Sequence, residues 1–312
     1  MNPPAALQSV LDPYGPHAEA VATLAWVLFG GGAIVFVVVA GFTAYALYSP
    51  ERRRRSIASG RFVIYAGIAF PGIVLTALFV YSLTLARDVV PAGAADLRVE
   101  VIGHQWWWRV RYLDASGGVD FVTANELRLP AGRSVELILS SADVIHSFWV
   151  PALAGKLDMI PGSVKRLRVD AARTGLFRGQ CAEYCGGPHA LMALYVVALD
   201  EDEFERWRAA QRRSAREPQS DRERRGRTLF LEHCAACHAV RGTPAEGVLG
   251  PDLTHVASRH SLAAGALPNG AEAIARWIRD SQRVKPGNLM PSLDIFTDED
   301  LSALAAYVAA LD

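Results

Sequence analysis

The chain begins with two long runs of apolar residues. Residues 20–48 contain no charged side chain, and neither do residues 62–86. Each run exceeds the roughly 20 residues that a helix needs to cross a hydrocarbon core of about 30 Å. A buried core helix is rarely so long and so apolar on all faces, so the pattern predicts two membrane-spanning helices. Pro71, in the second run, is tolerated if neighbouring groups satisfy the freed carbonyl.

The basic residues near these runs indicate an orientation. Residues 1–51 contain no lysine or arginine, whereas the short connection holds Arg61 and the four arginines of residues 52–55. Short cytoplasmic loops carry an excess of basic residues, so we expect this connection to face the cytoplasm. Both termini, and everything after residue 86, then lie outside it. The first run lacks the basic start of a secretory leader and is too long for one, and a shorter leader removed ahead of it stays open.

Beyond residue 86 the apolar residues come in short runs rich in valine, leucine and aromatic side chains. Pro-Ala-Gly and Pro-Gly-Ser segments between them are turn signals. Several short strands at this spacing predict an antiparallel β-sandwich or barrel of about a hundred residues. The strand-like runs are residues 97–112, 126–129, 134–139, 164–169 and 193–199.

The last third of the chain has a different pattern. Its first residues are densely charged, which predicts a short solvent-exposed helix at 202–213 and then a flexible linker. Helical patterns return at 271–281 and 298–311, with Thr297 placed as an N-cap. The chain is thus divided into an N-terminal segment with two transmembrane helices (1–90), a β domain (91–200), a charged helix and linker (201–225) and a helical domain (226–312).

Composition excludes one class of partner. The 32 basic and 32 acidic residues balance, so net charge gives no reason to expect nucleic acid. The hydrophobic fraction of 51% is high for a soluble protein because the two long runs contribute heavily to it. We therefore expect the membrane, and no nucleic acid, as the partner of this chain.

Candidate chemistry is concentrated in one segment of the β domain. Cys181, Cys185, His189 and Met192 fall within twelve residues. Soft thiolate and thioether ligands together with imidazole favour copper over hard cations. His146, between two strand-like runs, could meet this cluster across the sandwich. Two thiolates, two imidazoles and a thioether are too many for one four-coordinate metal, and suit two metals that share bridging thiolates.

Three other interpretations of these residues compete with copper. The two cysteines could form a disulfide in an oxidising compartment, but a disulfide does not require His189 or Met192 at an ordered spacing. Zinc is a second alternative, although it rarely recruits methionine. His146, taken alone, could be a structural histidine.

A second motif lies at the start of the helical domain. Cys234-Ala-Ala-Cys237-His238 is the pattern of covalent c-type haem attachment. A bare pair of such cysteines could also be half of a zinc knuckle or a redox pair, but this domain holds no second cysteine pair. Met290 is the candidate sixth ligand, and a histidine–methionine pair suits electron carriage. The rival ligands, which we expect to be surface histidines, are His233, His255 and His260.

Four segments of the β domain, together with the helical hairpin, carry a family resemblance. They are Gly-His-Gln-Trp-Trp-Trp (103–108), Ser-Ala-Asp-Val-Ile-His-Ser-Phe (141–148), Lys-Leu-Asp-Met-Ile-Pro-Gly (156–162) and the cysteine segment (179–192). Over roughly residues 10–205 the chain closely resembles cytochrome c oxidase subunit II. This resemblance implies a cupredoxin-like fold and the binuclear copper centre CuA. Its ligands would be His146, Cys181, Cys185, His189, Met192 and the backbone carbonyl of Glu183, whose side chain would also serve a magnesium ion at the contact with subunit I.

The same resemblance assigns Trp106 as the residue through which electrons enter. A strand places Trp106 and Trp108 on one face and Trp107 on the other, and we interpret Trp108 as a packing residue. Oxidases of this superfamily that take electrons from quinol lack the copper ligands, so their presence argues against that class. One departure lies at residues 61–65, where many family members carry an acidic residue at a proton-uptake entrance and this chain has none.

The helical domain resembles a class I cytochrome c. Met290 lies in Asn-Leu-Met-Pro, like the distal ligand of that family, and Gly-Pro-Asp-Leu (250–253) resembles the segment whose proline carbonyl accepts the proximal histidine's N–H. Gly226, Phe230 and Tyr307 fit its packed terminal helices. The expected fold class is multidomain: a two-helix transmembrane hairpin, a cupredoxin-like antiparallel β-sandwich and an all-α class I cytochrome c.

Together these resemblances imply the electron-relay subunit of a caa-type oxidase in a bacterial plasma membrane, with both metal domains on the outer side. Electrons would pass from the fused haem c to CuA and on to subunit I, where oxygen is reduced to water with proton pumping. The implied partners are subunits I and III and, as donor, a cytochrome c or a quinol–cytochrome c reductase complex. One other function stays open: a membrane-anchored electron-transfer or copper-handling protein that works without an oxidase, although one span would suffice to anchor it. An enzyme like nitrous-oxide reductase shares the copper motif but should have neither two spans nor this haem unit.

Overall fold

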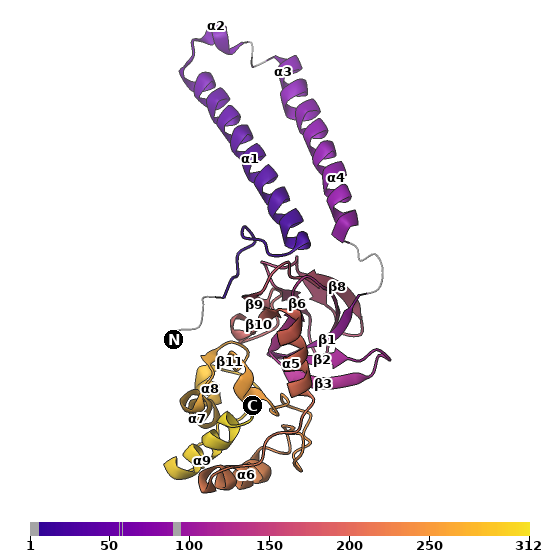
Figure 1. Cartoon of the computed structure of the whole chain (residues 1–312). Helices are drawn as coiled ribbons and strands as arrows, with labels where there is room; N and C mark the ends of the chain where they lie inside the picture. The colour runs from indigo at the N-terminus through magenta and orange to yellow at the C-terminus, as the bar shows by residue number, and fades with distance from the viewer. Residues whose placement is uncertain (1–5, 56, 58, 90–94) are drawn as a thin grey trace. The chain divides into compact units, whose positions relative to one another are not determined.

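The computed structural model describes residues 6–55, 57, 59–89 and 95–312. The chain forms two compact units (Figure 1). One unit comprises residues 1–18 and 93–312, and the other comprises residues 19–92. The predicted domain boundary at residue 90 lies outside the described residues.

Two helical segments form the smaller unit, as the apolar runs predicted (Figure 1). Pro16–Tyr48 and Gly60–Leu85 are long and apolar enough to cross a membrane. Large apolar side chains such as Phe36 and Ile73 are more than two-thirds exposed, which suits a lipid-facing surface. The helical elements are α1 (Pro16–Tyr48), α2 (Glu51–Arg54), α3 (Gly60–Ile64), a π-helical turn (Tyr65–Ala69) and α4 (Phe70–Val89).

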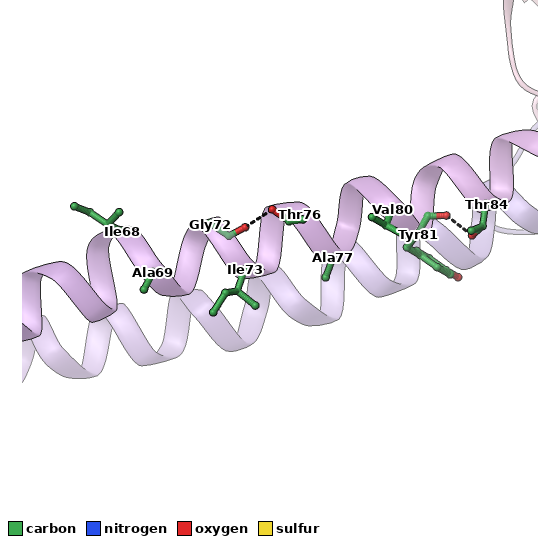
Figure 2. A pocket seen from close by; sticks show the side chains of 9 residues that line it. All are labelled: Ile68, Ala69, Gly72, Ile73, Thr76, Ala77, Val80, Tyr81 and Thr84. Carbon is green, nitrogen blue, oxygen red and sulfur yellow. Dashed lines mark hydrogen bonds between the residues drawn. The ribbon is translucent and has the colours of Figure 1, made fainter.

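A wide helical turn precedes the proline of the second span. The π-helical turn Tyr65–Ala69 ends two residues before Pro71. Proline has no N–H to donate to the carbonyl four residues earlier, and its ring would collide with that carbonyl, so the helix widens locally. Beyond it, Thr76 and Thr84 each donate a hydroxyl hydrogen bond to a helix carbonyl 2.7 Å away (Figure 2). These two hydroxyl groups are therefore satisfied within the helix.

Two five-stranded sheets make up the β domain. Their orders are β3-β2-β1-β5-β8 and β4-β10-β9-β6-β7. Alternate residues of both sheets fill one core, in which Trp108, Phe148 and Phe177 are at most 1% exposed. The strands are β1 (Leu97–His104), β2 (Trp107–Leu113), β3 (Val119–Ala124), β4 (Glu126–Pro130), β5 (Ser134–Ser141), β6 (His146–Trp149), β7 (Leu157–Met159), β8 (Lys165–Asp170), β9 (Gly175–Cys181) and β10 (Ala193–Leu199).

The sandwich agrees with the sequence-based prediction except in its details. Most ladders are antiparallel, but β1 pairs with β5 and β4 with β10 in parallel. Parallel neighbours need a long crossover, which apolar patterning does not reveal. The single run predicted at 97–112 is two strands, because a turn at 105–106 folds β2 back onto β1. Residues 6–18 also pack on this domain, where Leu7 N donates to Leu176 O (2.9 Å).

The charged segment is less solvated than predicted. Helix α5 (Glu201–Gln211) forms, but Arg208 and Arg212 both pair with Asp120 of β3, at 3.1 and 2.7 Å. The segment predicted as a flexible linker hydrogen-bonds to the helical domain, with Ala215 N donating to Arg241 O (3.0 Å). The composition of the charged segment is typical of a solvent-exposed face. The carboxylate of Asp120, which binds its arginines, is some 90 residues away in the chain, so composition alone did not indicate this contact.

The helical domain is built on the crossing of its first and last helices. At that crossing a Cβ on Gly226 would lie 2.1 Å from the Ala303 carbonyl oxygen, so only glycine lets the helices approach so closely. Phe230 and Tyr307 stack edge-on beside it. Thr297 caps the last helix by accepting from Asp300 N (3.1 Å), as predicted. The elements are α6 (Asp221–His233), β11 (Ser261–Leu262), β12 (Leu267–Pro268), α7 (Ala271–Arg279), α8 (Ser281–Val284) and α9 (Asp298–Ala309).

Candidate copper and haem sites

The residues predicted as copper ligands converge at one end of the second sheet. His146 begins β6, Cys181 ends β9, and the loop between β9 and β10 carries the others. The main chain fixes this loop, because Cys181 N donates to Met192 O (2.9 Å) and Ala182 N to Ser147 O (2.9 Å). The backbone itself therefore brings His146 close to the cysteine loop, although the two are distant in the chain.

Each donor atom of the cluster lies within 4 Å of another. The two sulfur atoms of Cys181 and Cys185 are 3.8 Å apart. His146 Nδ1 lies 3.8 Å from Cys181 Sγ, while His189 Nδ1 and Met192 Sδ lie 3.5 and 3.9 Å from Cys185 Sγ. Each cysteine thus has one imidazole beside it, which is the arrangement that two metals sharing two thiolates require. Both cysteines are free thiols, so the disulfide alternative is not adopted.

The main-chain carbonyl of Glu183 faces Cys181. Its carbonyl oxygen accepts a hydrogen bond from the Cys181 thiol at 3.2 Å. Its carboxylate points elsewhere and lies 4.0 Å from Lys156 Nζ, with both side chains about half exposed. The carbonyl and the carboxylate of this residue therefore face different surroundings.

The two thiols do not titrate alike. The hydrogen bond with Cys185 lowers the pKa of Cys181, with further help from His146 and from main-chain groups, while the same hydrogen bond and burial raise the pKa of Cys185. Since the thiolate is the form that binds a metal, the site gives up its first proton easily. The second proton leaves only when a cation compensates the charge.

Asp143 holds one imidazole in place, a role that the sequence analysis missed. Its Oδ1 lies 2.8 Å from His146 Nε2, and its Oδ2 accepts from Gln105 N (2.7 Å). A carboxylate on one ring nitrogen fixes the tautomer that leaves the other nitrogen free for a metal. The signal was present, because Asp143 lies three residues before His146 within the motif.

Trp106 lies directly against the cysteine loop. Its indole N–H donates to the Cys185 carbonyl at 2.9 Å, and Gln105 Nε2 donates to the same oxygen at 2.8 Å. Trp108, by contrast, is fully buried and packs edge-on against Phe148, so its interpretation as a packing residue is confirmed. The strand β2 begins at Trp107, and Trp106 belongs to the turn before it.

The haem-attachment motif follows α6. Cys234 and Cys237 are free thiols on a turn, and His238 Nδ1 lies 2.8 Å from the Pro251 carbonyl oxygen. That contact, expected from the resemblance, leaves Nε2 of His238 for a metal. Gly250 faces the ring, where a Cβ would lie 2.5 Å from Cε1 of His238. The residues present thus fit an iron-bound histidine packed closely between main-chain groups.

Met290 is half-buried and packs against the core of the helical domain. Its main chain is held by Ser281 Oγ, which donates to its carbonyl at 2.6 Å. The rival histidines have other partners: His233 stacks on Phe296, and His260 lies 2.9 Å from Glu126 Oε2. The prediction that His255 lies at the surface is wrong. It is 4% exposed, because Nε2 contacts the Arg213 carbonyl (3.0 Å) of the charged segment.

Known proteins carry both halves of this arrangement. The family model for the periplasmic domain of cytochrome c oxidase subunit II matches residues 120–199, and that for cytochrome c matches residues 223–312. Cytochrome c oxidase subunit 2 of Alkalihalophilus pseudofirmus is 33% identical over 318 residues, which cover 97% of this chain and 90% of that relative. The chain belongs to the cytochrome c oxidase subunit II family.

Other members are similar over shorter stretches. The subunit 2 of Bacillus subtilis is 32% identical over 255 residues, covering 77% of this chain and 70% of the relative. A crystal structure of the periplasmic domain of subunit II from Bradyrhizobium japonicum is 32% identical and covers 39% of this chain and 96% of that one, with a TM-score of 0.36. As a subunit II, the chain is part of a haem-copper terminal oxidase, an oxidoreductase. Its subunit II domain indicates copper, and its cytochrome c domain indicates haem.

Proposed function

We propose that this chain is the electron-relay subunit of a caa-type oxidase, which carries electrons from a covalently attached haem c to a binuclear CuA centre and on to subunit I. Oxygen reduction to water and proton pumping belong to subunit I. One observation carries the proposal: the soft donor cluster and the haem-attachment motif lie in the same compact unit of one chain. A tethered donor replaces diffusional docking by a high effective concentration.

The β domain would hold the copper pair and control its surroundings. Copper held by Cys181 and Cys185 would supply one-electron carriage. Asp143 holds the His146 ring at 2.8 Å, and Trp106 is tied to the Cys185 carbonyl, so both groups stay fixed when charge arrives. The side-chain ligands proposed are His146, Cys181, Cys185, His189 and Met192, with the carbonyl of Glu183.

The helical domain would hold the haem. Cys234 and Cys237 would attach the haem covalently, and His238, through Nε2, and Met290 would hold its iron. The Pro251 carbonyl, 2.8 Å from His238 Nδ1, orients the ring and raises its basicity. This ligand pair supports electron carriage and not oxygen binding.

The membrane arrangement follows from charge. With the arginine-rich connection in the cytoplasm, both termini and both metal domains face the outer side of a bacterial plasma membrane. We further propose subunit III as a partner, a cytochrome c or a quinol–cytochrome c reductase complex as donor, and the half-exposed Glu183 carboxylate as a magnesium contact shared with subunit I.

Metal and haem content test this proposal. The purified full chain, produced with haem-attachment machinery and copper, is expected to show c-type haem absorbance and about two coppers per chain. Haem without copper, despite copper supplementation, would overturn the copper assignment. Co-purification of the native chain with a many-span subunit separates an oxidase from a free-standing electron-transfer protein.

The iron ligand has its own test. Met290→Ala is expected to remove the low-spin signature of the haem, because no second strong-field ligand then remains. His233→Ala is the matched control and is expected to keep the spectrum. If Met290→Ala leaves the spectrum unchanged, another residue ligates the iron.

A further inference from the structure

The helical domain contacts the β domain beside the copper ligands. Ala193, the residue after Met192, donates its main-chain N–H to the Ala264 carbonyl (2.9 Å). Ala264 lies in the turn between β11 and β12, and Gly265 beside it has φ +82°. A Cβ on Gly265 would lie 2.9 Å from the Cβ of Ala193. The two main chains therefore touch closely, with no side chain between them.

Lys285 connects this turn to Trp106, the proposed residue of electron entry. Its Nζ donates to the Trp106 carbonyl at 2.6 Å and to the Ala263 carbonyl at 3.0 Å. The first oxygen belongs to the β domain and the second to the helical domain. Lys285 itself follows α8, five residues before Met290, so the segment that carries the proposed iron ligand is held at the same point.

This lysine occupies a position where lysine is rarely found. Lys285 is only 2% exposed, and the two oxygen atoms that its Nζ contacts belong to uncharged main-chain carbonyls. Burial lowers the pKa of Lys285 to about 7, and the nearby Cys185 partly opposes this. Burying an ammonium group is costly, so this one is retained against a penalty that an apolar residue would not incur. An apolar residue could fill the space but could not join the two carbonyls.

Additional contacts join the two domains at a place other than Lys285. Arg128 donates to the Ser258 carbonyl (2.8 Å), and the main-chain N–H of His260 donates to Glu126 Oε2 (2.7 Å). Both lie along β4 and fix the helical domain at a second place. Lys285 is the contact that reaches Trp106, and Trp106 is the residue bonded to the Cys185 carbonyl.

We propose that Lys285 is a positioning residue that keeps the tethered helical domain docked at Trp106, so that electrons pass between the two domains without a diffusional encounter at each turnover. The inference rests on the proposed electron-relay function and adds to it the device that fixes the donor. It also follows that the docked domain covers the main chain beside Trp106, which leaves a separate cytochrome no access to that side of the copper site.

The first test uses the full chain loaded with haem and copper, and it measures docking and not electron transfer. Hydrogen–deuterium exchange at the Ala193 amide reports docking, because that N–H donates across the contact. In the full chain, Lys285→Met is expected to speed exchange at Ala193 by about 10- to 100-fold, the factor that one hydrogen bond to a charged group contributes to an equilibrium. Lys165→Met, on the edge strand β8, is the matched control and is expected to leave it unchanged.

Amides inside the domains separate undocking from unfolding. Those of Val196 in β10 and Leu304 in α9 are expected to keep their protection in Lys285→Met, since both belong to the domain cores. If this variant fails to fold, Lys285→Gln decides, because it keeps a donor but shortens the reach and is expected to loosen Ala193 less. Unchanged exchange at Ala193 in a folded Lys285 variant overturns the proposal.

The second test uses the loaded oxidase. Haem-to-copper electron transfer in the wild type is expected to be independent of solvent viscosity, whereas in Lys285→Met it becomes slower and viscosity-dependent, since the domain must first return to its partner. A merely structural lysine would not introduce viscosity dependence. If the wild type shows no haem-to-copper transfer, the proposed function fails; if both proteins transfer alike at all viscosities, only the positioning role fails.

Discussion

Gly250 is the residue whose replacement tests most directly how the helical domain holds His238. A Cβ at this position would lie 2.5 Å from Cε1 and 2.8 Å from Nδ1 of the imidazole, whereas ordinary contact begins at 3.4 Å. Its φ is not in the left-handed region, so alanine fits the backbone and the conflict is purely steric. Gly250→Ala must therefore push the ring away by about 0.9 Å, which disrupts its contact with the Pro251 carbonyl.

The size of the effect follows from these contacts. Overpacking costs about 1–3 kcal/mol, and loss of the imidazole–carbonyl hydrogen bond adds about 0.5–1.5 kcal/mol. Alanine recovers about 0.4–1 kcal/mol by restricting the unfolded chain. We expect Gly250→Ala to lower the free energy of unfolding of the helical domain by about 0.5–4 kcal/mol, and to disturb ligation by His238 while the covalent attachment through the two cysteines persists.

Urea unfolding of the haem-loaded full chain, followed by haem absorbance, measures this change. Gly155→Ala is the matched control, because a Cβ there meets nothing within 4 Å. An unchanged midpoint together with an unchanged ligation spectrum would refute the reasoning, since it would mean that the ring is not packed against residue 250. A lower midpoint in the control as well would point to a general effect of the substitution.

Three further changes have expected outcomes. Asp143→Asn is expected to weaken copper binding about 10- to 100-fold, as loss of a carboxylate behind a ligating histidine does; copper titration measures it, and undiminished affinity would show that His146 needs no such support. Gly226→Ala is expected to destabilise the helical domain, because its Cβ would meet the carbonyl of the facing helix at 2.1 Å; a wild-type urea midpoint contradicts this. Burial alone would raise the pKa of Glu126, but the hydrogen bonds from His260 and the charge of a nearby arginine lower it below its ordinary value of 4.5. The stability that the Glu126 carboxylate contributes is therefore complete above about pH 4.5 and is lost as the pH falls through the lowered pKa. We expect the urea midpoint of Glu126→Gln to fall less than that of the wild type between neutral pH and about pH 3. An equally steep fall in the variant would mean that other groups cause the loss of stability in acid.

The sequence indicated the cluster of soft donors because four of them are close in the chain. Cys181 to Met192 form one loop between two strands, and a loop of this length keeps its donors together whatever the rest of the fold does. His146 needed the fold to join them. Asp143 was visible in the same motif, but its role depends on which ring nitrogen faces the cysteines, and spacing does not specify that.

Other features had no signal in the sequence. Lys285 contacts main-chain carbonyls, one of them 179 residues away, and any residue type can present a carbonyl. His255 is buried because the charged segment packs over it. The composition of that segment had instead predicted a solvent-exposed helix and a flexible linker. The parallel ladders of the sandwich depend on crossovers between distant strands, whereas patterning reports only which residues face the core.

The contact between the β domain and the helical domain is made largely by main-chain atoms. Ala193 and Ala264 meet N–H to carbonyl, and Lys285 and Arg128 each reach a carbonyl on the other domain. Apart from His260, whose ring contacts Glu126, this contact depends on the path of the backbone more than on the identity of the surface residues. A haem domain from a distant relative is therefore expected to be exchangeable into this chain, provided the graft keeps Gly265, His260 and Lys285, even when few of its other exposed residues match.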